Sequence, residues 1–199
     1  MAHRIVLASG SAIRATLLGN AGVDFDVTIA RIDEQAVKDS LVGEGASPRE
    51  VADALAEGKA RKIGLKEPEA LVIGCDQVLG FRGQLFSKPR SPEEARAQLG
   101  QLNGERHMLL SAAVIYHEGK PVWRHVGEVR LTMKTNSDAY LDAYVSRNWH
   151  SIRDAVGAYK LEEEGVRLFS RIDGEYFNVL GLPLLELLAY LAQRGAIAA

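Results

Sequence analysis

The chain has 199 residues and a formal net charge of −2, with 47% hydrophobic and 25% charged residues. It is long enough to bury a core, and its proportions are typical of a soluble globular protein. The charge shows no basic excess of the kind that binds nucleic acid, and no apolar stretch is long enough to span a bilayer. We therefore expect a cytoplasmic protein with neither nucleic acid nor membrane among its partners. The lone Cys75 excludes an intramolecular disulfide.

Strands and helices alternate in the first half of the chain. The predicted elements are a strand over 4–8, a helix over 12–20, a strand over 25–30, a loop over 31–46, a helix over 48–63 and a strand over 71–75. The helix start at Ser47 is clear, because Ser47, Pro48 and Glu50 form a capping-box pattern. A hairpin is predicted through Arg82-Gly83.

The second half contains more hairpin strands. The predicted elements are a helix from Ser91 to about 102, strands over 108–116 and 121–133, a helix from Ser137 to about 146, strands over 167–172 and 176–180, and a last helix from Pro183. Asp173-Gly174 is a typical hairpin turn between the last two strands. The pattern predicts one α/β domain over 1–199, with a mixed sheet flanked by helices and two lobes around a cleft.

Ser9-Gly10-Ser11 joins a predicted strand directly to a predicted helix, and Arg14 lies in the first helical turn. Free backbone N–H groups and the positive end of a helix dipole favour an anion at such a place. The simpler interpretation makes Ser11 an ordinary N-cap and Arg14 a solvated side chain. The stretch matches neither a Walker loop nor a dinucleotide fingerprint.

Two lysines are candidate phosphate ligands. Lys59 lies in the apolar stripe of its predicted helix, where a lysine either reaches out to solvent or points into a cleft. Lys88 follows a predicted strand and precedes Pro89, which favours an extended backbone. For each lysine taken alone, an ordinary surface role is the commoner outcome.

Asp76 follows a short apolar run and is followed by further apolar residues. A carboxylate where a buried strand stops is typical of catalytic groups in α/β proteins. Its neighbour Cys75 is expected on the opposite face of the strand, packed and inert. Asp33-Glu34 follows another strand and can hold Mg²⁺, or belong to a solvated loop.

Taken in order, the motifs of this chain resemble the Maf family of nucleoside triphosphate pyrophosphatases. The resembling segments are LASGSAIRATLL (7–18), IDE (32–34), LAEGKA (55–60), VIGCDQV (72–78), SKP (87–89), QLNGERH (101–107), GAYKLEEEG (157–165) and LGLPL (180–184). Each segment is short, whereas the ordered set is specific and covers nearly the whole chain.

The resemblance implies a Maf-like fold, similar to that of inosine triphosphate pyrophosphatases, and hydrolysis of a nucleoside triphosphate to the monophosphate and pyrophosphate with Mg²⁺ or Mn²⁺. In the family this is a house-cleaning activity associated with cell-division arrest, and homodimers occur. By this resemblance Asp76 is the general base and a metal contact, and Glu34 is a metal ligand. The implied phosphate-binding residues are Ser9, Ser11, Arg14, Lys59 and Lys88.

Three positions concern the choice of base. Gln77 and Glu162 match the branch of the family associated with 7-methyl-GTP, and a carboxylate at Glu162 can accept hydrogen bonds from guanine or pair with a methylated ring. Ile13 departs from the family signature, because the position before Arg14 is usually Arg or Trp. A non-catalytic nucleotide sensor that regulates cell division is the alternative function, and an enzyme of the inosine triphosphate pyrophosphatase type is a weaker one.

Overall fold

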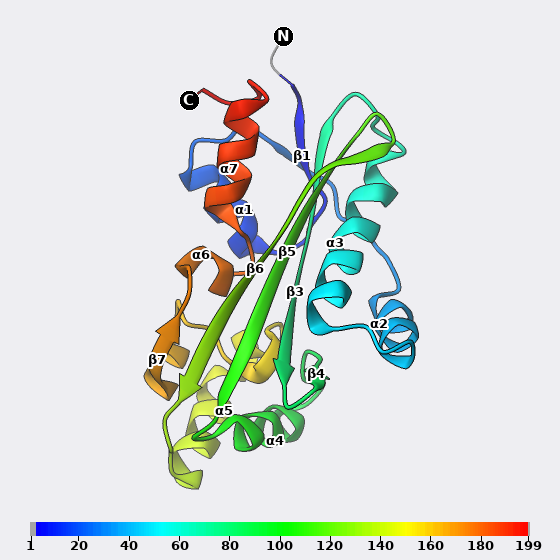
Figure 1. Ribbon diagram of the computed structural model, residues 1–199. Coiled ribbons are helices and arrows are strands. Elements are labelled where there is room, and N and C mark those ends of the chain that lie inside the picture. Colours follow the sequence, from blue (N-terminus) through cyan, green and yellow to red (C-terminus); the bar gives the residue numbers. More distant parts are fainter. Residues whose placement is uncertain (1–2, 199) are drawn as a thin grey trace.

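The computed structural model describes residues 3–198 and is built around a seven-stranded mixed sheet (Figure 1). The strands follow the order β2-β1-β3-β5-β6-β7, and β4 pairs with β3 outside this path. Their bounds are Ile5–Leu7 (β1), Asp26–Val27 (β2), Leu71–Phe81 (β3), Gln84–Phe86 (β4), Arg106–His117 (β5), Lys120–Met133 (β6) and Phe169–Asp173 (β7). The predicted α/β class with a mixed sheet is confirmed.

Helices flank the sheet in two groups. Their bounds are Ala12–Asn20 (α1), Glu34–Gly43 (α2), Pro48–Gly64 (α3), Pro92–Leu102 (α4), Asp138–Ile152 (α5), Tyr176–Val179 (α6) and Leu184–Gln193 (α7), with short 3₁₀ turns at Val156–Ala158 (η1) and Glu164–Leu168 (η2). The long strands β3, β5 and β6 connect the group near α1, α3 and α7 to the group near α4 and α5 (Figure 1). These groups are the two lobes.

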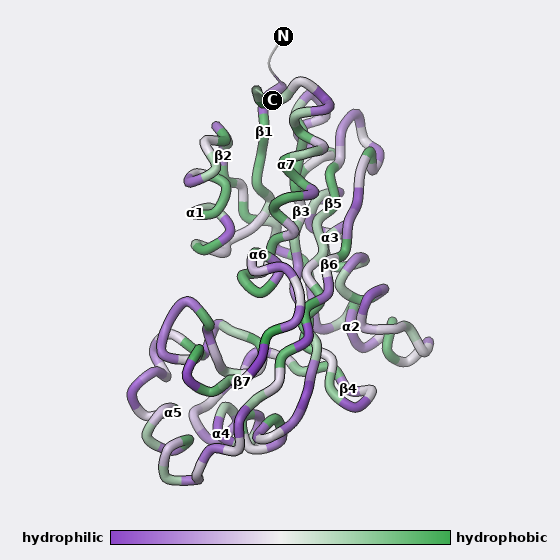
Figure 2. The backbone as a smooth tube through the Cα atoms, turned by 60° about the vertical axis from the view of Figure 1, so that its left-hand side comes forward, coloured by the Kyte–Doolittle hydropathy of each residue, from purple (hydrophilic) through white to green (hydrophobic). Residues whose placement is uncertain are grey.

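Three apolar clusters fill the space between sheet and helices. One lies under α3, one lies between the sheet and α1 with α7, and one joins the far end of the sheet to α4 and α5. The tube in Figure 2 is accordingly green along β1 and much of α7, whose inward positions are leucines. In the described part of the chain, no helix has both the length and the apolar character needed to cross a bilayer.

The open edge of β3 decides where a site can form. Along one side, β3 pairs with β5 continuously from Val72 to Gly80. Along the other side, β1 pairs with it only as far as Ile73, and β4 pairs only from Leu79 onward. The stretch between these two partners therefore has a free edge, and side chains from both faces of the strand border it.

The predicted end of a strand at Cys75 is wrong, because β3 runs through Asp76 to Phe81. Asp76 lies opposite Ala112 in the ladder with β5, so the strand continues past the carboxylate. The apolar residues that resume after Asp76 are the second half of this same strand. The position of the carboxylate is set by the end of β1 and not by the end of its own strand.

Helix α3 packs on β3 with its backbone in close contact. A Cβ atom on Gly74 would lie 2.2 Å from the carbonyl oxygen of Ala56 and 2.4 Å from the amide nitrogen of Ala60. Only glycine permits this approach. Because Lys59 lies between these two alanines in α3, and Asp76 lies two residues beyond Gly74 on the same strand face, the approach brings the lysine to the carboxylate.

Four other segments differ from prediction. The loop expected over 31–46 contains α2, whose N-cap Asp33 accepts a hydrogen bond from the backbone of Ala36. The strand expected over 176–180 is the one-turn helix α6, because Glu175 caps it through two backbone N–H groups. The strand expected over 25–30 is reduced to β2, and the helix from Ser137 continues to Ile152.

Candidate functional site

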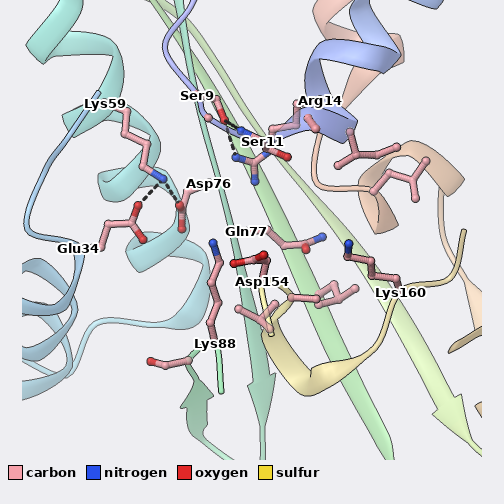
Figure 3. A pocket seen from close by; sticks show the side chains of 18 of the residues that line it. Ser9, Ser11, Arg14, Glu34, Lys59, Asp76, Gln77, Lys88, Asp154 and Lys160 are labelled. Atoms are coloured by element: carbon pink, nitrogen blue, oxygen red, sulfur yellow. Dashed lines mark hydrogen bonds and ion pairs between the residues drawn. The ribbon is translucent and has the colours of Figure 1, made fainter. Parts of the chain in front are cut away.

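A pocket of about 810 Å³ lies at the free edge of β3. Residues from the turn after β1, from α2, α3 and β3, from the loop after β4, and from the segment around η1 line it. These segments are far apart in the sequence, and the close-up shows their side chains pointing into the same space (Figure 3). The sequence-predicted residues Ser9, Ser11, Ile13, Arg14, Glu34, Lys59, Asp76, Gln77, Lys88 and Glu162 all line this pocket.

Lys59 lies between two carboxylates at one end of the pocket. Its ammonium nitrogen is 2.5 Å from Oδ1 of Asp76 and 2.8 Å from Oε1 of Glu34 (Figure 3). Lys59 is 8% exposed and Asp76 5%, so the lysine does not reach out to solvent. Burying the charge of Lys59 or of Asp76 alone would cost roughly several kcal/mol, and the contact between the two side chains offsets that cost. We call this region, with Glu34, Lys59 and Asp76, the Lys59 end.

The pKa of Glu34 lies below its ordinary value. Partial burial alone would raise it, but the hydrogen bond and charge of Lys59 outweigh this, and the charges of Lys38 and Lys88 add to the lowering. Glu34 is therefore an anion at neutral pH, and the cations that keep it ionised come from α2, α3 and the loop after β4.

Arg14 is a buried cation with no carboxylate partner in the described chain. Its guanidinium donates to the carbonyl oxygens of Gly181 at 2.7 Å and Cys75 at 3.0 Å, and to Oγ of Ser9 at 3.3 Å. These neutral acceptors hold the side chain in place but leave its charge uncompensated. An uncompensated buried cation that lines a pocket favours an anionic ligand.

The start of α1 adds neutral donors beside Arg14. Ser11 is the N-cap residue, yet its side chain makes no capping hydrogen bond and the first turn contains no acidic residue. The first backbone N–H groups of the helix therefore have no partner from that cap. Both the simple N-cap interpretation and the anion-binding interpretation place Ser11 here, and the uncapped geometry favours the second.

Further cations surround the same end. Lys88 is exposed at the pocket wall, and Gln98 fixes its loop by donating to the carbonyl oxygen of Ser87 at 2.9 Å. Lys38 and Arg90 also line the pocket. Within residues 3–198, none of Lys38, Lys88 and Arg90 forms an ion pair. The chain as a whole is slightly acidic, so this gathering of free positive charge is local.

Asp154 and Lys160 lie on the side of the pocket away from Lys59 (Figure 3), and Glu162 also lines the pocket. We call the region of Asp154, Lys160 and Glu162 the Lys160 end. Glu162 is exposed, and Lys160 donates to Oγ of Ser151 at 2.7 Å. The aromatic ring of Tyr159, which is buried, forms part of the wall here. Its hydroxyl lies 2.8 Å from Nε2 of His107, and burial lowers the pKa of His107 to about 4.

Cys75 is fully buried on the face of β3 opposite Asp76, in the cluster with α1 and α7. Burial raises the pKa of its thiol to about 11, although the nearby cations oppose this. The thiolate needed for nucleophilic chemistry is therefore scarce at neutral pH, and the prediction that Cys75 is packed in the core is confirmed.

Sequence reasoning missed Lys38, Arg90, Asp154, Tyr159 and Lys160. Lys38 lies one helical turn after Glu34, so recognition of α2 would have found it. Lys160 and Tyr159 lie inside the segment GAYKLEEEG, which carries the family resemblance. Asp154 follows α5 in an irregular segment, and no motif points to it.

The chain is similar to known proteins over nearly its whole length. The family model described as Maf-like protein matches residues 4–194. A nucleoside triphosphate pyrophosphatase from Ruegeria pomeroyi is 67% identical over 193 residues, which cover 97% of each chain. One from Caulobacter vibrioides is 47% identical, covering 97% of this chain and 96% of that protein. A 7-methyl-GTP pyrophosphatase from Brucella abortus is 44% identical, covering 99% of each chain. The chain therefore belongs to the family of Maf-like proteins.

Proposed function

We propose that this Maf-like protein hydrolyses a nucleoside triphosphate to the monophosphate and pyrophosphate. The observation that carries the proposal is the contact of one buried ammonium, that of Lys59, with the carboxylates of both Asp76 and Glu34 in a pocket rich in unpaired cations. The names of the relatives support the same reaction.

The cations of the Lys59 end bind the triphosphate. Arg14 is held rigidly by carbonyl groups and offers its charge without an internal counter-ion, and Lys88 approaches from the opposite wall. Ser9 and Ser11 supply hydroxyl groups beside the free N–H groups of α1. Positive groups fixed before the reaction stabilise the charge that develops on the departing pyrophosphate.

Asp76 acts as the general base. One oxygen of its carboxylate contacts Lys59. The other oxygen has no hydrogen-bond partner in the described chain and is not fully enclosed by protein. Asp76 removes a proton from water as the water oxygen bonds to phosphorus and the α–β phosphoanhydride bond breaks. The pyrophosphate leaves with the bonding electron pair. The contact with Lys59 orients the carboxylate for this transfer.

The carboxylates of Glu34 and Asp76 fit a Mg²⁺ or Mn²⁺ ion, which would screen the phosphates and orient them when bound. Within residues 3–198, no group of three or more His, Cys, Asp and Glu side chains is arranged as a metal site. A two-carboxylate donor set with open oxygens suits an ion that takes its other ligands from water and substrate. Both carboxylates also contact Lys59 in this structure, so the ion would share these two side chains with the ammonium.

The base of the substrate meets Ile13, Gln77 and Glu162, and 7-methyl-GTP is our first candidate. Glu162 at the Lys160 end offers a carboxylate to guanine N–H groups or to the positive ring of a 7-methylated base. The 44% identical relative from Brucella abortus bears that activity in its name. Ile13 offers apolar contact and no charge.

The experiment that tests this function identifies the products from a panel of natural and modified nucleoside triphosphates. We expect monophosphate and pyrophosphate in equal amounts with Mg²⁺ or Mn²⁺, and a loss of turnover of at least about a hundredfold with excess chelator. Diphosphate and inorganic phosphate as products would contradict the assignment. Tight binding of a nucleotide without any product would favour the alternative of a nucleotide sensor.

A further inference from the structure

The amide of Gln77 is held in one orientation by the protein itself. Its nitrogen Nε2 lies 3.0 Å from each of three oxygens: Oγ of Ser111 and the backbone carbonyls of Asn178 and Val179. Gln77 lines the pocket and lies directly opposite Ser111 in the ladder between β3 and β5. The close-up shows its side chain extending across the pocket floor (Figure 3).

The three oxygens determine that the amide nitrogen of Gln77, and not its oxygen, faces them. Backbone carbonyls only accept hydrogen bonds, so an amide oxygen placed against them would be repelled. Ser111 gives its own proton to the carbonyl of Asn178 at 2.6 Å, so it too presents an acceptor to Gln77. The two N–H hydrogens of the amide are therefore both used within the protein.

The carbonyls that hold Gln77 belong to the end of α6. The last carbonyls of a helix have no partner inside the helix, and here a side chain from the sheet supplies one. The start of α6 is fixed as well, because the carboxylate of Glu175 accepts from the N–H groups of Phe177 and Asn178. Ser111 on β5 is 0% exposed and supplies the third oxygen that holds the amide of Gln77.

The opposite end of the amide remains available. Oε1 of Gln77 accepts no hydrogen bond from residues 3–198. Protein atoms do not fully enclose this oxygen, so a ligand can reach it. Gln77 thus offers a ligand an acceptor and no donor. A base whose facing edge also carries only acceptors would lose the hydrogen bond and bring two oxygens or an oxygen and a nitrogen lone pair together.

We propose that Ser111 and the α6 carbonyls are positioning groups that fix Gln77 as a hydrogen-bond acceptor, so that the site selects nucleotides whose base presents an exocyclic amino group. This inference rests on the proposed function for the identity of the ligand as a nucleoside triphosphate. It assigns Ser111 a role in selectivity although the residue is buried behind Gln77.

The test measures selectivity within pairs that differ at the amino group: GTP against ITP, ATP against purine riboside triphosphate, and CTP against UTP. Each is measured by kcat/KM, and its α,β-methylene analogue by Kd. We expect the wild-type protein to prefer the amino-bearing member of at least one pair by about tenfold, the value of one hydrogen bond. Gln77→Met should reduce that ratio to about 1, and Ser111→Ala should reduce it by about threefold.

Ser170→Ala is the matched control, since that hydroxyl also lies near a backbone carbonyl, that of Thr132, but on β7. Its selectivity ratio should equal that of the wild type. Lower thermal stability in the Gln77 and Ser111 variants with unchanged ratios would overturn the inference and leave Gln77 as a structural cap of α6. No preference in any pair for the wild type would overturn it too.

Different results would contradict the proposed hydrolysis and the proposed selectivity of Gln77. Selective binding of the methylene analogues without turnover of the parent nucleotides would contradict the proposed function and support this inference. Turnover without discrimination would do the reverse, and a wild-type protein that binds none of the nucleotides would contradict both.

Discussion

The two ends of the pocket are built on different principles. At the Lys59 end, regular elements hold the charged groups: α3 carries Lys59, the middle of β3 carries Asp76, and the first turn of α2 carries Glu34. At the Lys160 end, Asp154, Lys160 and Glu162 lie in irregular chain around η1. The first end suits chemistry, which needs groups fixed in position, and the second suits recognition, which tolerates variation from one relative to the next.

The largest expected difference between the ends concerns Lys59. Lys59→Met removes the shared partner of two carboxylates and leaves a nearly buried charge, so we expect a loss of about 3 kcal/mol in the free energy of unfolding. Urea denaturation measures it, and pyrophosphate release should fall in parallel. Arg61→Met on the exposed face of the same helix is the control and should change stability by less than about 0.5 kcal/mol. An equal change in the free energy of unfolding for the two variants would show that Lys59 contributes no more to stability than an exposed residue of the same helix.

The wall of the Lys160 end should weaken in acid. His107, with a pKa of about 4 when folded, gains its proton near pH 6.5 when unfolded, so the unfolded state binds more protons between these values. Stability contributed by neutral His107 is present above pH 6.5 and is lost as the pH falls. We expect it to decrease by about 2 kcal/mol between pH 7.5 and pH 5. Chemical denaturation of His107→Gln at both pH values should lack this component, and an identical pH dependence would refute it.

Lys88 should separate binding from stability at the Lys59 end. It is exposed and forms no ion pair within residues 3–198, so Lys88→Met should leave the free energy of unfolding unchanged. Loss of one phosphate contact should raise KM by about tenfold. Steady-state kinetics on the best substrate measures this, with Lys66→Met as the exposed control. A KM equal to that of the wild type would exclude Lys88 from the phosphate site.

The smallest expected effect lies at Glu162. Glu162→Gln keeps the shape but removes the charge, so the preference for 7-methyl-GTP over GTP should fall by about threefold, because the contact is exposed to solvent. Glu69→Gln, exposed and remote, is the control for this ratio of kcat/KM. If the ratio of kcat/KM for 7-methyl-GTP to that for GTP is unchanged, residues other than Glu162 select the nucleobase.

The sequence carried more information about the Lys59 end than about the Lys160 end. Lys59 interrupts an apolar stripe and Asp76 interrupts an apolar strand, and both anomalies are visible in the residue order. Which strand edge lies open beside Asp76 is not visible, because it depends on how far β1 and β4 extend along β3. The sequence therefore suggested a strand end where the structure has a gap between neighbouring strands.

Local capping residues explain the remaining differences. The residue order leaves Asp33-Glu34 as either a Mg²⁺-binding pair or part of a solvated loop. In the structure Asp33 is the N-cap that starts α2, and this helix places Lys38 at the pocket. Asp173-Gly174 has the composition of a hairpin turn, but Glu175 starts a helix directly after it. The amide of Gln77 then caps that helix, a contact between residues about a hundred positions apart that no local pattern predicts.

Hydrolysis depends most on Asp76, and one paired measurement on Asp76→Asn tests this dependence directly. The asparagine keeps the size of the side chain and removes the base, so turnover should fall by about a thousandfold while the Kd for an α,β-methylene nucleotide changes by less than about tenfold. Asp142→Asn, at an exposed ion pair with Arg96, is the control. Turnover of Asp76→Asn within about threefold of the wild type, on every substrate that the wild type hydrolyses, would contradict the assignment of Asp76 as the base.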